Sequence, residues 1–327
     1  MAVTARAAPT ALALRALGLG DFLTGLPAIR ALARALPEHR VVLAAPAALA
    51  PLAALVPEIH RLVPAAPLAP LPELGALEVA VNLHGQGPES HRLLLACSPR
   101  RLVAFRHEAI PATAAAPSFD PEEHEVRRWC RLLDESGMPA DPDDLALHLD
   151  DAPSETAGYA VLHPGAASAS RRWPPTRFAA VARWLERHCR PVVLSAGPGE
   201  ERLAREVAGR AGLAAHRIFA RRDLRALARL VRDAGLLVCG DTGIAHLATA
   251  FGTPSVVLFG PTPPSRWGPP SGRPQHRVLH QGDVGDPHGE TLDPGLAAIA
   301  PEDVIDEIEW LEQRLPAQRP GTAVVSA

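Results

Sequence analysis

A polar triplet, Asp241-Thr242-Gly243, interrupts a long apolar stretch of the sequence, and His246 follows one helical turn later. The apolar residues before the triplet are typical of a buried strand, and those after it are typical of a helix. The first amides of a helix have no partners within the helix and carry about half a positive charge. A backbone opened by Gly243, with the Thr242 hydroxyl and the His246 ring beside it, would therefore suit a pyrophosphate. An ordinary helix cap formed by Asp241 or Thr242 explains the same residues, so both interpretations stay open.

A second candidate anion site follows the strand-like run that ends at His163. A loop of small residues, with Ser168 among them, leads to the pair Arg171-Arg172 and then to a helix that begins with proline. Small residues leave backbone amides accessible, and guanidinium groups bind phosphate oxygens in a bidentate way. The loop therefore predicts a second contact to phosphate, and the alternative is a solvated, charged loop.

The third candidate is a carboxylate, Asp21, at the end of a glycine-rich turn that contains Gly18 and Gly20. The turn lacks the full GxGxxG pattern of a dinucleotide-binding loop. A carboxylate that faces a cleft can take a proton from a hydroxyl group. The alternative is that Asp21 only caps the helix that follows.

Composition limits the classes of function. The chain has 327 residues, enough for two domains, and 47% of them are hydrophobic, as in a globular protein with full cores. A net charge of -3 provides no overall field that would attract nucleic acid. The sequence contains no lysine, so all 33 basic residues are arginine.

Metal, disulfide and membrane signals are weak. No cysteine pair has CxxC spacing, which indicates the reduced thiols of a cytosolic protein. His276 and His280 lie four residues apart, but their segment does not look helical, so no metal site is expected there. Arg15 interrupts the first apolar run, which therefore indicates a strand of the fold and not a signal peptide. No run reaches the roughly 18 apolar residues of a membrane span.

The order of elements indicates an α/β fold with parallel sheets, because strand-like and helix-like segments alternate along the chain. Strands are expected at residues 11–17, 40–45, 60–63, 77–83, 101–105, 159–164, 191–197, 236–240 and 255–260. Helices are expected at residues 22–36, 47–55, 122–136, 176–188, 199–212, 223–234, 243–251 and 301–315.

A segment rich in Pro, Asp and Ser near residue 150 predicts a boundary between two doubly wound domains, 1–150 and 151–315, with a disordered tail at 316–327. Ligands of such folds bind beyond the carboxyl ends of the strands, and the crevice between the domains is the expected site.

The three motifs, in this order and spacing, resemble those of glycosyltransferase family 9, the ADP-heptose heptosyltransferases of lipopolysaccharide core synthesis. They read GLGD-x(4)-LPAIRALARALP, HPG-x(5)-RRWP-x(3)-F and GDTGIAHLATAFGTP-x(3)-LFGPT, and the resemblance extends from about residue 11 to residue 313. It implies the GT-B architecture, in which two Rossmann-like domains face a central cleft. The N-terminal domain would bind the acceptor and the C-terminal domain the nucleotide sugar.

The activity that the resemblance implies is an inverting, metal-independent transfer of a sugar, and the family's donor indicates heptose. The sugar would pass from an ADP-activated donor to a hydroxyl of a glycan or glycolipid such as the lipopolysaccharide core. No cofactor is implied beyond the donor, and no nucleic acid partner. The location implied is the cytoplasm, and a peripheral association with the inner membrane is compatible with it.

The resemblance also implies roles for individual residues. Asp21 matches the proposed general base, with Gly18 and Gly20 in the loop on the acceptor side. The implied donor-binding residues are Ser168, Arg171, Arg172, Glu200 or Glu201, Asp241, Thr242, Gly243 and His246. The two glutamates are alternatives for the contact to ribose. Arg171 stands where many members carry a lysine; the lysine-free composition explains the change, and altered donor geometry is the other explanation.

Two other functions remain open. The first is a transferase of the same fold that uses a UDP- or GDP-activated sugar on a secondary metabolite or another glycan. The second is a sugar-nucleotide binding protein without catalytic activity. A nicotinamide oxidoreductase is disfavoured because the GxGxxG pattern is missing.

Overall fold

The computed structural model describes residues 8–220 and 222–315. The chain divides into two compact units, Met1–Leu145 and Ala146–Ala327, close to the change of composition near residue 150. The tail expected at 316–327 lies outside the described residues.

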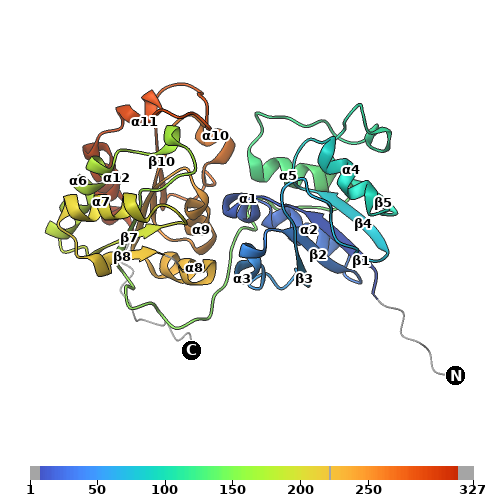
Figure 1. Ribbon diagram of the computed structural model, residues 1–327, viewed down its shortest axis with the longest axis horizontal. Helices are drawn as coiled ribbons and strands as arrows, with labels where there is room; N and C mark the ends of the chain where they lie inside the picture. Colours follow the sequence, from blue (N-terminus) through green and yellow to red (C-terminus); the bar gives the residue numbers. More distant parts are fainter. Residues whose placement is uncertain (1–7, 221, 316–327) are drawn as a thin grey trace. The chain divides into compact units, whose positions relative to one another are not determined.

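The first unit is built on a parallel sheet of five strands in the order β3-β2-β1-β4-β5 (Figure 1). The strands are β1 (Thr10–Leu14), β2 (Arg40–Ala45), β3 (Arg61–Pro64), β4 (Leu77–Asn82) and β5 (Arg101–Val103). The helices are α1 (Leu19–Thr24), α2 (Leu26–Ala35), α3 (Ala50–Ala53), α4 (Glu89–Ala96) and α5 (Glu125–Glu135), with short 3-10 turns η1 (Ala47–Leu49) and η2 (Pro111–Thr113).

Both faces of this sheet are covered, which explains its nearly continuous apolar strands. On one face Leu12 and Leu14 pack with Leu94 of α4. Successive residues of a strand point to opposite faces, so Ala11 and Ala13 lie on the other face. All of these strand residues are buried. Helices α2 and α5 pack against each other.

The strand order of the first unit reverses between β1 and β4, which are neighbours although β2 and β3 separate them in sequence. Ligands of open α/β sheets bind at such a reversal, outside the carboxyl ends of the two strands. The segment that carries Asp21 follows β1, and residues 83–88 follow β4. The fold therefore places both segments where a ligand of this unit would bind.

The single helix expected at residues 22–36 is wrong: the structure has two helices, α1 and α2, which meet at Gly25. The expected glycine-rich turn at 18–21 is also wrong, because α1 already begins at Leu19 and Gly18 is its N-cap. Gly25 allows Arg15 to approach closely, since a Cβ there would lie 3.3 Å from Arg15 Nε. The break therefore makes room for a buried guanidinium beside the helix that carries Asp21.

The second unit has a parallel sheet of six strands in the order β11-β10-β9-β6-β7-β8. The strands are β6 (Ala160–His163), β7 (Val192–Ala196), β8 (Ile218–Ala220), β9 (Leu236–Gly240), β10 (Ser255–Phe259) and β11 (His276–His280). The helices are α6 (Pro175–Arg187), α7 (Glu201–Ala211), α8 (Leu224–Asp233), α9 (Gly243–Phe251), α10 (Pro264–Trp267), α11 (Pro294–Ala298) and α12 (Pro301–Arg314), with η3 (Ala169–Arg171) and η4 (Ala215–Arg217).

The core of the second unit lies between its sheet and three helices, of which α6 packs against both α7 and α12. Trp173 and Phe178 are fully buried there, with ring centroids 5.0 Å apart. Helices α8 and α9 pack against each other. The strand order reverses between β6 and β9, so the loops after these two strands lie together at the carboxyl edge.

Two strands, β8 and β11, were not among the expected elements. His276 and His280 are the first and last residues of β11. All four cysteines are free; Cys130 and Cys239 are buried, whereas Cys189 is exposed. In residues 8–220 and 222–315, no helix has the length and apolarity that crossing a bilayer requires.

Candidate active site

The Asp241-Thr242-Gly243 triplet lies between the carboxyl end of β9 and the start of α9, as the sequence predicts. Thr242 is the N-cap residue of α9, with extended backbone angles (φ −147°, ψ 168°). Its hydroxyl is 3.4 Å from the carbonyl oxygen of Gly240 and makes no capping hydrogen bond to the described helix. His246 lies one turn along α9, its ring 5.9 Å from that of Trp267. The opening amides of α9 are therefore not held by the Thr242 side chain and can bind an anion.

The loop that carries Arg171 lies against this helix start. The Nη1 group of Arg171 donates a hydrogen bond to the backbone oxygen of Asp241 (3.2 Å) and lies 3.9 Å from Asp241 Oδ2. Its Nε donates to the hydroxyl of Ser168 (3.3 Å). Gly240 permits this approach, because a Cβ there would lie 3.2 Å from the Arg171 carbonyl oxygen. Two motifs that are 70 residues apart thus place a guanidinium beside the first amides of α9.

Arg172 does not join this group of residues. Its guanidinium donates to the carbonyl oxygens of Ala166 (2.8 Å) and Ala167 (3.3 Å), which lie in its own loop. It lines a shallow hollow of about 390 Å³ together with His288 and Glu290. Arg172 therefore holds the loop in shape, whereas Arg171 faces α9.

Asp241 is buried, with 7% of its surface exposed. Burial raises the pKa of its carboxyl group to about 6, and the nearby positive charge of Arg171 opposes that shift only in part. At neutral pH the side chain is therefore a charged group in an unfavourable environment. Unfavourable burial of this kind is common at functional sites.

Replacing Asp241 with asparagine is expected to stabilise the fold at pH 7.5. Because the folded-state pKa lies above that of an unfolded aspartate, the native carboxylate destabilises the fold above about pH 6, and this penalty disappears toward pH 4. One pKa unit corresponds to about 1.4 kcal/mol, so the gain in unfolding free energy is on the order of 2–3 kcal/mol. Urea unfolding at pH 7.5 and pH 4.5 measures it. The exposed Asp306→Asn is the control, and equal stability of Asp241→Asn and wild type at pH 7.5 would contradict the expectation.

Glu200 and Glu201 have different surroundings. Glu200 Oε2 accepts the Gly197 N–H (2.8 Å) and lies 3.6 Å from the ring nitrogen Nε2 of His163. A Cβ at Gly165 would collide with this carboxylate, so the loop after β6 passes directly beside it. Glu201 is the first residue of α7 and lines a neighbouring cavity.

That cavity, of about 320 Å³, lies at the carboxyl ends of β6, β7 and β8. Phe219, Leu224 and Leu227 give it apolar walls, and the guanidinium of Arg222 lies 5.9 Å from the Phe219 ring. The cavity is thus an apolar hollow with polar groups at its margin, at the same sheet edge as the start of α9.

His163 was not predicted as a site residue. It ends β6, lines the same cavity and shares a hydrogen bond between its Nδ1 and the Ser195 hydroxyl (2.9 Å). Burial lowers the pKa of this histidine, and the Glu200 carboxylate opposes the shift. A neutral imidazole between Ser195 and Glu200 is therefore a fixed polar wall of the cavity.

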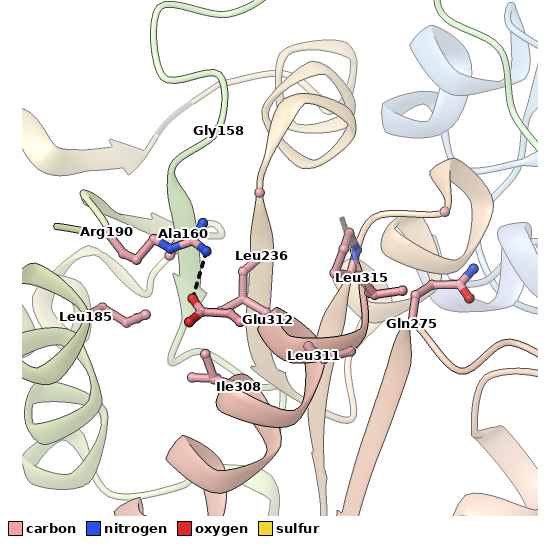
Figure 2. Close-up of a pocket in the computed structure, with 13 residues that line it drawn as sticks. Gly158, Ala160, Leu185, Arg190, Leu236, Gln275, Ile308, Leu311, Glu312 and Leu315 are labelled. Carbon is pink, nitrogen blue, oxygen red and sulfur yellow. Dashed lines mark ion pairs between the residues drawn. The ribbon is translucent and has the colours of Figure 1, made fainter. Parts of the chain in front are cut away.

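A second cavity, of about 280 Å³, lies at the opposite, amino-terminal edge of the same sheet (Figure 2). Ala160 and Leu236, at the starts of β6 and β9, contribute to it, as does Ile308 of α12. Figure 2 shows the ion pair between Arg190 and Glu312 (2.9 Å) at this cavity. Because ligands of parallel α/β sheets bind at the carboxyl edge, this cavity is not the candidate donor site.

Asp21 of the first unit lies in the first turn of α1. Its Oδ2 accepts the Gly18 N–H (3.2 Å), so it does cap its helix, and its Oδ1 lies 3.5 Å from Arg15 Nη2. The carbonyl oxygen of Gly20, in the same helix, accepts a hydrogen bond from the Thr24 hydroxyl (3.0 Å). Burial raises the pKa of Asp21, and Arg15 opposes the shift, while 27% of the side chain stays exposed. A partly exposed carboxylate with a raised pKa is suited to accepting a proton near neutral pH.

Arg15, close to Asp21, was not predicted as a functional residue from the sequence. Its side chain is completely buried, and its Nε donates to the backbone oxygen of Asp21 (2.7 Å). Its Nη2 forms an ion pair with Glu125 of α5 (2.8 Å). The only signal in the sequence was a charged residue at the end of an apolar strand.

Comparison with known proteins identifies the family. The family model of glycosyltransferase family 9 (heptosyltransferase) matches residues 105–286. Lipopolysaccharide heptosyltransferase 1 of Escherichia coli strain K12 is 27% identical over 150 residues, which are 44% of this chain and 46% of that protein. The match to this curated relative thus spans about half of its length.

Two solved structures share the fold of nearly the whole chain. The ADP-heptose lipopolysaccharide heptosyltransferase II of E. coli superposes with a TM-score of 0.74 at 21% identity and covers 92% of this chain and 98% of its own. The E. coli heptosyltransferase WaaC, solved with ADP, has a TM-score of 0.71 at 19% identity and covers 92% and 99%. These similarities confirm the expected architecture of two doubly wound domains. Because the family model covers more than half of the sequence, the chain belongs to glycosyltransferase family 9, the heptosyltransferases.

Proposed function

We propose that the protein transfers heptose from an ADP-activated donor to a hydroxyl group of a glycan or glycolipid such as the lipopolysaccharide core. The transfer inverts the configuration at the anomeric carbon of the sugar and needs no metal ion. One observation carries the proposal: Arg171 is held against the start of α9, at the sheet edge where an apolar cavity also opens. With a lipopolysaccharide acceptor, the protein acts in the cytoplasm and associates peripherally with the inner membrane.

The donor would bind along the carboxyl edge of the second sheet. The diphosphate lies on the amides of Gly243 and the following residues, with Arg171 and the Thr242 hydroxyl as further donors. The adenine occupies the apolar cavity beside Phe219. The ribose must join the two. Glu200 is placed for that contact, because its carboxylate lies beside Gly165 of the loop after β6 and accepts the N–H of Gly197, which lines the cavity.

The chemistry follows from these placements. The Asp21 carboxylate takes the proton from the acceptor hydroxyl as its oxygen attacks the anomeric carbon of the donor. The bond from that carbon to the diphosphate breaks, and the departing charge is stabilised by the α9 amides and by Arg171. The fixed positive groups of the second unit take the place that a metal ion has in other phosphate sites. The proposal requires that Asp21 and the start of α9 face one shared groove during transfer.

A nucleotide panel in a thermal-shift assay tests the donor. We expect ADP to raise the melting temperature, whereas UDP and GDP leave it unchanged. At an ADP concentration about 100 times the dissociation constant, binding should raise the free energy of unfolding by roughly 2.7 kcal/mol. Thr242→Val should weaken the response to ADP more than it changes the melting temperature of the free protein, because the Thr242 hydroxyl makes no capping bond. Glu312→Gln, at the other cavity, is the matched control and should respond as wild type does.

Two outcomes would favour other functions, and a third would contradict the proposed mechanism. Stabilisation by UDP or GDP but not ADP would indicate a transferase of the same fold with another donor. Binding of ADP without transfer to any acceptor would indicate a protein that only binds sugar nucleotides. Loss of transfer after treatment with EDTA, restored by a divalent metal, would contradict metal independence.

A further inference from the structure

We propose that Arg15 and Glu125 form a buried ion pair that positions the Asp21 carboxylate for proton abstraction. The inference rests on the proposed function, because it assigns positioning residues to the base of that reaction. Neither residue is a catalytic group itself, since both act through Asp21.

A single guanidinium holds Asp21 at two points. Arg15 Nε donates to the backbone oxygen of Asp21 (2.7 Å), and Arg15 Nη2 lies 3.5 Å from the carboxylate oxygen Oδ1. The other carboxylate oxygen accepts the Gly18 N–H (3.2 Å). Both oxygens and the main chain of the proposed base are thus fixed, and such preorganisation is what a catalytic group requires.

The same guanidinium connects four elements of the first unit. Its Nη2 donates to the Thr24 hydroxyl of α1 (3.1 Å), and its Nη1 donates to the carbonyl oxygen of Leu83, just after β4. Arg15 itself follows β1, and Glu125 belongs to α5. The guanidinium therefore ties Asp21 to the point where the strand order reverses, the expected ligand position of this sheet.

Glu125 supplies the countercharge that a fully buried arginine needs. Its Oε1 lies 2.8 Å from Arg15 Nη2 and accepts the indole N–H of Trp129 (2.7 Å), and its Oε2 pairs with Arg128. The Trp129 ring also lies 4.9 Å from the Arg15 guanidinium. Burial alone would raise the pKa of Glu125, but the contacts to Arg15, Trp129 and Arg128 lower it, so the group stays ionised.

A buried ion pair is weak evidence of a stabilising role. Apolar residues of similar size stabilise a core as well as a buried ion pair does, and often better. The pair instead has a consequence for its partly exposed neighbour. Burial and Glu125 raise the pKa of Asp21, whereas Arg15 and the Gly18 amide lower it. His84 is another titratable group near the pair, and its pKa is lowered by burial and by Arg15.

The pH profile of kcat/KM tests the inference, because its acid limb reports the pKa of the base in the free enzyme. Arg15→Gln removes the positive charge beside Asp21 and should move the acid limb to higher pH. Glu125→Gln removes a negative charge and leaves Arg15 uncompensated, so it should move the limb to lower pH. Both variants should keep the wild-type affinity for ADP. Glu123→Gln, which removes the neighbouring carboxylate paired with Arg131, is the matched control and should leave the limb in place.

A general loss of structure would not move the acid limb in opposite directions in Arg15→Gln and Glu125→Gln. Because Arg15→Gln removes a buried group that bonds several elements, thermal melts must accompany the profiles, and Glu125→Gln carries the test by itself if Arg15→Gln does not fold. An unchanged acid limb in Glu125→Gln, or shifts of both variants in the same direction, would overturn the inference. If the wild-type protein shows no transfer, or if Asp21→Asn keeps full turnover, the proposed function fails instead.

Discussion

Replacing Asp21 with asparagine is expected to leave the fold intact and to lower turnover by about 10²–10⁴, the usual contribution of a general base. The amide keeps the size of the side chain, and its oxygen can still accept the Gly18 N–H that caps α1. It cannot take a proton from the acceptor hydroxyl. Initial rates with ADP-heptose and a lipopolysaccharide acceptor measure the loss, and a thermal melt confirms folding.

The matched control for Asp21→Asn is Glu78→Gln, which removes an exposed carboxylate of the same unit that pairs with Arg100. This control should keep wild-type turnover. The wild-type enzyme should lose activity as the pH falls, because burial raises the pKa of Asp21 and the protonated carboxyl cannot act as a base. Near-wild-type turnover in Asp21→Asn would refute the assigned role.

Replacing Arg171 with methionine is expected to lower turnover by about 10²–10³, as removal of one preorganised donor to a developing negative charge does elsewhere. The guanidinium donates hydrogen bonds to the Asp241 carbonyl oxygen (3.2 Å) and to the Ser168 hydroxyl (3.3 Å). These bonds hold it beside the start of α9 before a donor binds. Arg171→Lys keeps the charge but loses the forked geometry, and should fall between wild type and Arg171→Met. The order of the three turnover rates separates charge from shape.

Calorimetry with ADP provides the second measurement on Arg171. Arg171→Met should bind ADP more weakly than wild type, whereas Arg190→Met, which removes an arginine at the opposite sheet edge, should bind it equally well. Wild-type affinity and turnover in Arg171→Met would show that the diphosphate does not bind at this helix start.

Much of the fold could be predicted because the strands are short apolar runs between strong turn signals. The helix at 243–251 has the bounds expected from the sequence, since a polar triplet precedes it and Gly252 ends it in the left-handed conformation (φ 70°). The break at Gly25 was missed although the sequence holds a local signal for it: Pro27, in the first turn of α2, lacks the N–H that would continue the preceding helix. The close approach of Arg15 to Gly25 could not be predicted, because it depends on tertiary structure. Strand β8, at 218–220, was missed because three residues carry no periodicity.

The candidate site was predictable only as separate pieces. Parallel strands bring their carboxyl ends to one edge, so the sequence could place Arg171 and Asp241 on the same side of the sheet. It could not tell which of two adjacent arginines faces the helix, because Arg172 turns to its own loop through contacts that depend on tertiary structure. It also could not reveal Arg15, whose partner Glu125 lies 110 residues away. The roles of these residues remain predictions.

An experimental structure of the protein with an ADP-heptose analogue and acceptor bound is the most direct measurement of the central claim. We predict that the diphosphate contacts the first amides of α9 and Arg171, that the adenine lies beside Phe219, and that an acceptor hydroxyl lies within hydrogen-bond distance of Asp21 across a common groove. A nucleotide bound away from α9, or an Asp21 carboxylate on a surface that the donor does not share, would contradict the account.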